Sequence, residues 1–256
     1  MTAGTVTVGP FVVADATRAG LTEALAEACV SAGRPTRIFA LHVGGLNQWR
    51  NSRFVALVND AEWVYADGAA VVLVARAAGA TDIQRAPTTD LAHEVLDAVA
   101  NRAGRTVRIA LIGGPPGLAE RAARQLEDGH AAEAVGISDG FQRDWSSLLQ
   151  QLRRAQPDVV FVGMGMPREA EWVTEHLDAL PPALIMTCGG WFGFLAGEES
   201  RAPERVQQHG AEWIWRLVQS PRLLSRYVRG AATTASLVVG AVAARKRNSR
   251  RQVIAR

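Results

Sequence analysis

One acidic residue, Asp67, stands where a short apolar run gives way to an apolar helical pattern. Tyr65-Ala66-Asp67-Gly68 ends the run, and the helical pattern covers residues 69–78. Two interpretations of Asp67 are open. Its side chain caps the amino end of that helix, with Gly68 easing the turn, or it projects from the end of a strand and acts as a general base. The segment alone favours the cap.

Two glycine-containing turns follow apolar runs further along the chain. Gly113 and Gly114 belong to the sequence IGGPPG, and Gly163 and Gly165 belong to GMGMPREAEW. Glycines between a strand and a helix let backbone N–H groups approach a phosphate, which the helix amino terminus also favours. A generic glycine-rich turn is the alternative. Neither turn has the GxGxxG spacing, so a nicotinamide cofactor is not indicated.

The elements that must position these residues follow from the hydrophobic periodicity. Short β-branched or apolar runs alternate with segments of helical period. The expected strands are residues 6–13, 36–42, 63–66, 107–112, 134–137, 159–162 and 183–187, and further helices are expected at residues 17–32, 89–103, 117–126, 145–155 and 168–177. This alternation predicts an α/β, Rossmann-like fold, with a mainly parallel sheet and helices on both faces. In such folds ligands bind at the carboxyl edge of the sheet, where Asp67 and both glycine turns would lie.

Charge divides the chain into two parts. Residues 213–256 hold ten Lys or Arg residues and no acid, whereas the other residues hold 18 basic and 25 acidic side chains. We therefore expect a core over residues 1–200 and a basic, helical, membrane-docking appendage over residues 201–256, with helical segments at 203–219 and 221–229. The apolar stretch at 231–244 has fourteen residues, short of the roughly 20 that cross a bilayer. A helix lying in the interface of an anionic membrane is expected instead.

The remaining totals fit a cytoplasmic protein at the inner face of the cell membrane. Cys29 and Cys188 lie far apart without a CxxC spacing, which argues against a disulfide framework or a zinc site and fits a reducing compartment. The first residues lack the basic and long apolar parts of a signal peptide. A nucleic-acid-binding arm is an alternative interpretation of the basic tail, but such an arm has no need of the apolar stretch. No nucleic acid is therefore expected as a partner.

The sequence resembles the WecG/TagA/CpsF family of glycosyltransferases from about residue 36 to residue 229. The matching segments are FVALVNDAEWVYADGAAVVLVAR, RAPTTDL, IALIGGPPG, GISDGF, PDVVFVGMGMP with Trp172, and residues 188–227. The resemblance implies an inverting, metal-independent transfer of an N-acetylmannosamine-type sugar. The donor would be a UDP-N-acetylhexosamine, with no other cofactor, and the acceptor a polyprenyl-diphosphate-linked N-acetylglucosamine in cell-surface polysaccharide synthesis. It also implies self-association in solution and a shift to the monomer on membranes.

The resemblance assigns roles to residues as well. It makes Asp67 the catalytic base. The chain has no DxD sequence, so arginines and helix amino termini, rather than a metal ion, are expected to neutralise the leaving UDP. A solvated arginine face beside an apolar helical stripe is the alternative for the appendage. The expected nucleotide-sugar site comprises Gly113, Gly114, Gly140, Phe141, Gly163, Gly165, Arg201, Arg216, Arg222 and Arg226.

Two departures from the family pattern concern the acceptor side. ALHVGGLNQW, residues 40–49, replaces a T-x-N signature, and His42 or Asn47 takes over its role; a buried structural His42 is the alternative. PREAEW replaces Pro-Lys/Arg-Gln-Glu-x-Trp. Both leave the donor sugar and the acceptor open. A second class of function stays possible, a Rossmann protein that binds a sugar nucleotide or dinucleotide without transferring a sugar.

Overall fold

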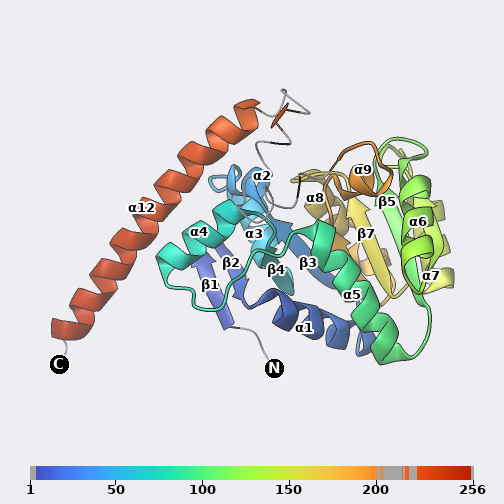
Figure 1. Ribbon diagram of the computed structural model, residues 1–256, viewed down its shortest axis with the longest axis horizontal. Coiled ribbons are helices and arrows are strands. Elements are labelled where there is room, and N and C mark those ends of the chain that lie inside the picture. Colours follow the sequence, from blue (N-terminus) through green and yellow to red (C-terminus); the bar gives the residue numbers. More distant parts are fainter. Residues whose placement is uncertain (1–3, 201–202, 204–214, 216, 219–223, 255–256) are drawn as a thin grey trace.

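A six-stranded parallel sheet, ordered β4-β3-β8-β7-β5-β6, forms the centre of the protein. A computed structural model describes residues 4–200, 203, 215, 217–218 and 224–254 (Figure 1). A separate antiparallel pair joins β1 to β2. The expected α/β fold with a parallel sheet is confirmed. The strands are β1 Gly4–Val8, β2 Phe11–Asp15, β3 Thr36–Leu41, β4 Trp63–Ala66, β5 Val107–Gly113, β6 Ala132–Ser138, β7 Val159–Gly163 and β8 Leu184–Thr187.

Helices cover both faces of the sheet. They are α1 Arg18–Val30, α2 Val43–Leu46, α3 Ser52–Asn59, α4 Ala69–Ala78, α5 Thr88–Ala103, α6 Leu118–Gly129, α7 Ser146–Ala155, α8 Arg168–Glu175 and α9 Trp191–Leu195, with a 3₁₀ turn at Leu177–Ala179. Successive strand residues enter two separate cores, as Ile38 and Phe39 of β3 show. One core lies beneath α1, α5, α6 and α9; the other lies beneath α3, α4, α7, α8 and the β1–β2 pair. Both faces are therefore closed to water, which explains the continuous apolar runs of the central strands.

The first predicted strand is wrong. Residues 6–13 belong to two antiparallel strands that are joined by a turn at Gly9 and Pro10. Gly9 has a φ of +61°, which glycine adopts without steric cost. Pro10 has no N–H to donate to a ladder, so a single strand cannot continue through it.

The appendage also differs from its prediction. One helix, α12 Leu224–Ile254, runs without a break, where the sequence indicated a helix ending at residue 229 and a separate apolar stretch. Its segment Leu224–Arg247 has 24 residues and contains a stretch of 18 residues with a mean hydropathy of 1.3, so by length and composition alone it could cross a membrane. The expectation that the apolar stretch lies in the interface of a membrane stays a prediction. Most of the predicted segment 203–219 lies outside the described residues.

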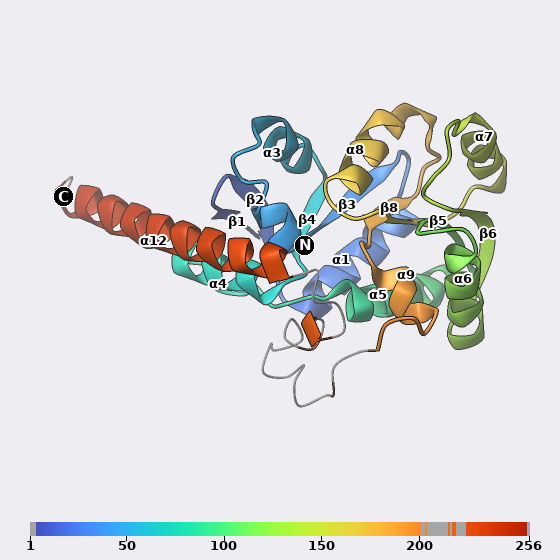
Figure 2. The ribbon, with the colours of Figure 1, turned by 90° about the horizontal axis from the view of Figure 1, so that it is seen from above.

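A narrow stripe of α12 packs on the core. Gly230, Thr233 and Leu237 are buried, and their spacing of three and four residues places them on one side of the helix. Gly230 lies against Val43, and Leu237 lies against the turn at Gly9. The helix runs beside α4 and extends beyond the rest of the molecule at its carboxyl end (Figures 1 and 2).

Candidate active site

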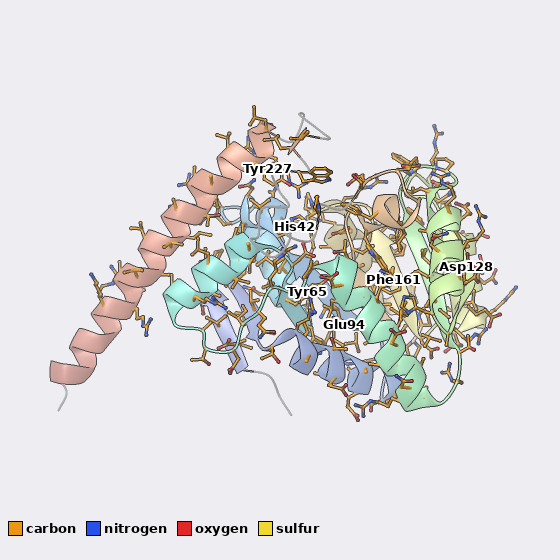
Figure 3. The ribbon with its side chains drawn as sticks, viewed as in Figure 1. His42, Tyr65, Glu94, Asp128, Phe161 and Tyr227 are labelled. Atoms are coloured by element: carbon orange, nitrogen blue, oxygen red, sulfur yellow. The ribbon has the colours of Figure 1, made fainter. Side chains whose placement is uncertain are left out.

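The loops at the carboxyl edge of the sheet carry the predicted core residues of the site. His42 follows β3, Asp67 follows β4, Gly114 follows β5, Gly140 follows β6 and Gly165 follows β7. Parallel strands end at the same edge, so one edge receives all five positions. Figure 3 shows His42 and Tyr227, the latter in the first turn of α12, toward the same end of the molecule.

Asp67 is held by the first residue of α5. Its Oδ1 accepts hydrogen bonds from the backbone N–H of Thr88, at 2.7 Å, and from the Thr88 hydroxyl, at 2.8 Å. Among the described residues, no donor reaches Oδ2. The side chain is half-buried. The carboxylate is thus fixed through one oxygen, and its other oxygen is left for a substrate.

A buried tyrosine orders this arrangement. The Tyr65 hydroxyl lies 2.7 Å from Thr88 Oγ1. Thr88 has one hydroxyl proton, which it donates to the carboxylate, so the phenol must donate to Thr88. Burial, together with the negative charge of Asp67, holds the pKa of Tyr65 well above its usual value, so the phenol keeps its proton. The hydrogen bonds therefore run in one direction, from the Tyr65 hydroxyl to the Thr88 hydroxyl and from there to Asp67 Oδ1, and they orient the carboxylate.

The interpretation of Asp67 as the cap of α4 is wrong. Gly68 is the N-cap of that helix, and no side chain bonds to its first turn as a cap. The carboxylate instead accepts from a backbone N–H in the first turn of α5, 21 residues further along the chain. The general-base role of Asp67 is compatible with this geometry and stays a prediction.

Sequence reasoning missed a second acid at this edge, Glu169 in the first turn of α8. Its side chain is fully buried. Its Oε2 accepts from the backbone N–H groups of Met164, Gly165 and Gly189 at 3.2, 2.9 and 3.0 Å, while Oε1 is buried without a hydrogen-bond partner among the described residues. Burial raises the pKa of Glu169 to about 7, with the three amides opposing the rise and Asp67 adding to it. Glu169 thus joins the loop after β7 to the loop after β8 by hydrogen bonds, close enough to Asp67 for the two charges to interact.

Replacing Glu169 with Gln should remove part of the dependence of stability on pH. The pKa of the folded state, about 7, lies above the ordinary 4.5, so between these values the folded protein keeps a proton that the unfolded chain loses. The protonated carboxyl therefore stabilises the folded protein fully below the unfolded-state pKa, and this stabilisation is lost as the pH rises through the folded-state pKa. The free energy of unfolding falls by about 3 kcal/mol over this range. Gln offers the three amides an oxygen and does not titrate. Urea unfolding at about pH 4.5 and about pH 8 should show the free-energy difference between wild type and variant changing by about 3 kcal/mol.

Glu171→Gln is the matched control for this measurement. Glu171 lies two residues further along α8 and is exposed, so its replacement should leave the pH dependence of unfolding as in the wild type. A Glu169→Gln protein whose unfolding free energy follows pH as the wild type does would contradict a protonated, buried carboxyl at this position.

The glycines after β5, β6 and β7 pack against one another. Gly113 has a φ of +144°, and a Cβ there would collide with the Gly163 carbonyl. The Gly114 amide donates to the Gly163 carbonyl at 3.1 Å, and the Gly140 amide donates to the Gly114 carbonyl at 2.8 Å. Close backbone packing, the generic alternative, accounts for these glycines. Their contact with a nucleotide stays a prediction.

The strand order separates this glycine cluster from Asp67. Three strands lie between β4 and β5, which corresponds to about 19 Å at about 4.8 Å per strand. At the far end Phe141 is 65% exposed, and the Arg168 guanidinium lies 5.4 Å from the centre of its ring. Arg168 also donates to the Gly140 carbonyl. The predicted glycines and Phe141 therefore lie at one end of this edge, separated from Asp67 at the other end.

His42 and Asn47 hold the beginning of α12. His42 Nδ1 accepts from the Gly44 amide at 2.9 Å and lies 3.2 Å from Arg226 Nη2. Both neighbours are N–H donors, so Nδ1 must be unprotonated to accept from them, and the neutral ring carries its proton on Nε2. Asn47 Nδ2 donates to the Arg226 carbonyl at 3.1 Å. His42 is a half-buried cap of α2 rather than a buried structural histidine, and the acceptor-side role of either residue stays a prediction.

The contact with His42 places Arg226 near Asp67. His42 follows Leu41 at the end of β3, Asp67 follows Ala66 at the end of β4, and Leu41 and Ala66 are paired in these neighbouring strands. The other predicted arginines, Arg201, Arg216 and Arg222, lie outside the described residues. Within the part of the chain that the structure describes, no group of three or more His, Cys, Asp or Glu side chains is placed to hold a metal ion.

These features define a parallel α/β protein with a positioned carboxylate at the carboxyl edge of its sheet and a basic, apolar helix beside it. The sequence model of the glycosyl transferase WecG/TagA/CpsF family matches residues 6–251, and the chain belongs to this family. It is also similar to the N-acetylglucosaminyldiphosphoundecaprenol N-acetyl-beta-D-mannosaminyltransferase of Bacillus spizizenii, with 28% identity over 178 residues, which are 69% of this chain and 68% of that protein. The resemblance inferred from the sequence is confirmed, and the protein is a glycosyltransferase by family.

Proposed function

We propose that this protein moves an N-acetylhexosamine of the N-acetylmannosamine type from UDP to a lipid-linked N-acetylglucosamine diphosphate during synthesis of a cell-surface polysaccharide. The Bacillus spizizenii relative is named for a transfer of this kind. The single observation that carries the proposal is the fixation of Asp67 through Oδ1, by two hydrogen bonds from Thr88, at the ligand-binding edge of the sheet.

The reaction is an inverting displacement. The acceptor hydroxyl attacks the anomeric carbon of the donor sugar, its proton moves to Oδ2 of Asp67, and the electrons of the cleaved bond leave with UDP from the opposite face. A carboxylate is a weak base for a sugar alcohol, so it takes the proton only as bond formation acidifies the hydroxyl. The buried Tyr65–Thr88 chain keeps the carboxylate oriented during this step.

Arginines, rather than a metal ion, stabilise the leaving diphosphate in this proposal. Preorganised donors aimed at developing charge contribute several kcal/mol per site. Arg226 is the described member of this group and lies at the start of α12, against His42. The absence of a DxD sequence supports the metal-independent route.

The same helix attaches the protein to the inner face of the membrane. Only 17% of the apolar window of α12 is buried, and Val228, Val239 and Val242 are exposed along it. Basic residues follow the apolar part, at positions 245–247, and such residues are attracted by anionic lipids. Because α12 begins beside the Asp67 loop, attachment through it brings a lipid-linked acceptor to the catalytic edge.

Release of UDP from a panel of UDP-N-acetylhexosamines, with a lipid-like N-acetylglucosamine diphosphate as acceptor, tests the proposal. We expect acceptor-dependent release with one donor and an unchanged rate after a chelator is added. Omission of the acceptor is the control for simple hydrolysis. Binding of a UDP-sugar without transfer to any acceptor would instead favour a sugar-nucleotide-binding protein, and loss of activity with the chelator would contradict metal independence.

A further inference from the structure

The side of α12 that faces away from the core carries the large apolar side chains of this helix. Leu224, Val228, Val239 and Val242 are all exposed. An α-helix turns by about 100° per residue, so these four positions fall within a sector of about 60°. That sector lies opposite the stripe of α12 that packs on the core. We call these four residues the docking face.

The exposed surface of α12 also has no charge over a long stretch. From residue 230 to residue 244 every exposed residue is Ala, Ser, Val or Gly. A helix face that lies in water normally carries charged side chains, as α6 does with Arg124, Glu127 and Asp128. The outward side of α12 is therefore suited to a partner that excludes water.

The core accompanies α12 along the whole of this stretch (Figures 1 and 2). Asn47 donates to a carbonyl in the first turn, at residue 226. Further along, Leu237 lies against the turn at Gly9, and the Arg245 guanidinium lies beside Gly79 at the end of α4. From residue 226 to residue 245 the helix rises by about 28 Å, which is close to the thickness of the hydrocarbon layer, about 30 Å. A membrane can therefore reach α12 only from its outward side while the helix stays on the core.

Basic residues stand at both ends of the uncharged stretch. Arg229 precedes it, and Lys246 and Arg247 follow it. A helix that crossed a bilayer would carry one of these ends through the hydrocarbon layer to the outer side, where Lys and Arg are disfavoured. A helix that lies in the plane of the membrane keeps both ends at one leaflet, where anionic lipids attract them. A second copy of α12 on the docking face would instead bring like charges together, whichever way the two helices ran.

We propose that the docking face seats α12 in the plane of the inner leaflet of an anionic membrane, while the core stays packed on the opposite side of the helix. Both basic ends then lie at the same leaflet, and the helix does not cross the bilayer. The inference rests on the proposed membrane attachment and deepens it, because it assigns the side of the helix that enters the lipid and the side on which the carboxyl end of the chain remains.

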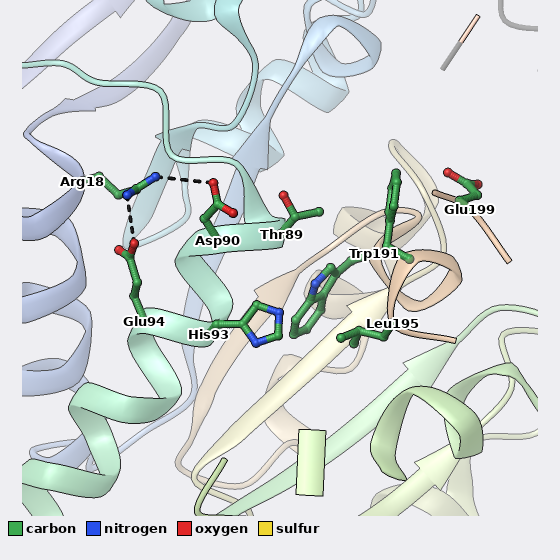
Figure 4. A pocket seen from close by; sticks show the side chains of 9 residues that line it. Arg18, Thr89, Asp90, His93, Glu94, Trp191, Leu195 and Glu199 are labelled. Carbon is green, nitrogen blue, oxygen red and sulfur yellow. Dashed lines mark hydrogen bonds and ion pairs between the residues drawn. The ribbon is translucent and has the colours of Figure 1, made fainter. Parts of the chain in front are cut away.

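This orientation places the catalytic edge at the level of the lipid headgroups. The first turn of α12 lies against His42, at the end of the strand that neighbours the strand of Asp67. A lipid-linked diphosphate lies at the same level, so the acceptor sugar meets the edge without leaving the membrane. A pocket of about 610 Å³ between α5 and α9 lies on the face of the sheet opposite α4 (Figure 4). That side of the protein stays in water, from which a soluble donor arrives.

Cysteine labelling from the two sides of a membrane tests whether α12 crosses it. Lys246→Cys places a thiol after the uncharged stretch, and Ser225→Cys, the control, places one before it; both positions are exposed. A membrane-impermeant maleimide is added to spheroplasts, which present the outer face, or to everted vesicles, which present the inner face. The wild-type protein, with Cys29 and Cys188, gives the background. We expect both new thiols to be labelled in everted vesicles and neither in spheroplasts. A Lys246→Cys protein that is labelled in spheroplasts, or in neither preparation, would overturn the inference.

Nitroxide labels test which side of α12 enters the lipid. Val239→Cys carries a label on the docking face. Gly240→Cys is the matched control, because it is the next residue, is also exposed and has open space around its Cβ position, but lies outside that face. When anionic vesicles are added to the full-length proteins, the label at 239 should lose most of its collisions with a water-soluble relaxation agent. The label at 240 should keep most of them, because the plane of the membrane passes on the other side of the helix.

Three other results of the nitroxide measurement would each contradict the inference. Shielding of both labels indicates a helix surrounded by lipid, shielding of neither indicates attachment through the basic residues alone, and magnetic broadening between labels on two chains indicates a second copy on the docking face. None of these measurements uses sugar transfer. A protein that takes the expected orientation but releases no UDP with any donor and acceptor would contradict the proposed transfer alone, whereas acceptor-dependent release by a protein with a crossing helix would contradict this inference alone.

Discussion

The Asp67→Asn protein should turn over its substrates about 10²- to 10⁴-fold more slowly than the wild type, because it lacks the carboxylate that we propose as the general base. Asn retains an oxygen that accepts from the Thr88 N–H and hydroxyl, the two bonds that position the wild-type side chain. The loop geometry should therefore persist, and only the basicity of the second oxygen is lost. Steady-state UDP release at saturating donor and acceptor measures the loss in kcat. Calorimetry should show UDP binding nearly as tightly as in the wild type.

Asp144→Asn is the matched control for this change. Asp144 accepts from the Ser146 N–H through Oδ1 and from the Ser146 hydroxyl through Oδ2, both at 2.9 Å. These are the same two kinds of donor that Thr88 offers to Asp67, but the Asp144 side chain is exposed before α7. This variant should keep the wild-type turnover. Unchanged turnover in Asp67→Asn would remove Asp67 from the role of base. A parallel loss of UDP binding would point to a structural role instead.

The central sheet could be predicted from the sequence because its strands are buried on both faces. In β7, Val159, Val160, Phe161 and Val162 are all fully buried, so the strand appears in the sequence as an uninterrupted apolar run. The hairpin at the amino end has a similar run, and only Gly9 and Pro10 mark its turn. Leu237 packs on that turn from the other end of the chain, and no local pattern predicts a contact of this range.

The sequence predicted which residues of the site follow the ends of strands, but it did not predict their contacts with one another. The partner of Asp67 depends on which helix begins beside β4, and the Thr88 hydroxyl meets it only after the intervening α4 has folded back. Glu169 reads in the sequence as an ordinary acid in the first turn of a helix, a position that acids favour. Its burial arises because the loops after β7 and β8 both turn their amides toward it. The departure PREAEW marks the position, but its spacing does not reveal this role.

Charge and hydropathy predicted a basic, apolar segment at the end of the chain, but they did not predict how α12 contacts the core. The sequence places basic residues and an apolar stretch after residue 213, and the structure adds that Gly230 and Thr233 let α12 approach α2 and α4 closely. The helix thus contacts the core through a narrow stripe that consists of Gly230, Thr233 and Leu237. Val228, Val239 and Val242 are left on the remaining surface, where we propose that a membrane takes them up.

Replacing Val239 and Val242 together by Gln should release the protein from anionic vesicles. Both valines are exposed on α12, and burial of each in the acyl boundary contributes about 1.5–3 kcal/mol. Losing both should lower the partition coefficient by about 10²- to 10⁴-fold, while Gln preserves the helix because its helix propensity is high. Co-sedimentation with vesicles of stated anionic lipid content at fixed salt measures this coefficient. Val30→Gln, the same change at an exposed valine in the last turn of α1, should leave it unchanged.

The activity of the same double variant shows what the attachment does for catalysis. With a soluble acceptor its turnover should equal that of the wild type, because Val239 and Val242 lie about 20 Å or more further along α12 than Arg226, which is the residue beside the Asp67 loop. With the acceptor embedded in vesicles, turnover should fall in parallel with binding, since enzyme and acceptor no longer share a surface. Unchanged vesicle binding that is abolished by salt would instead assign the attachment to the basic residues at 245–247. Tight binding to duplex DNA at the same salt, with none to vesicles, would revive the nucleic-acid interpretation of the tail.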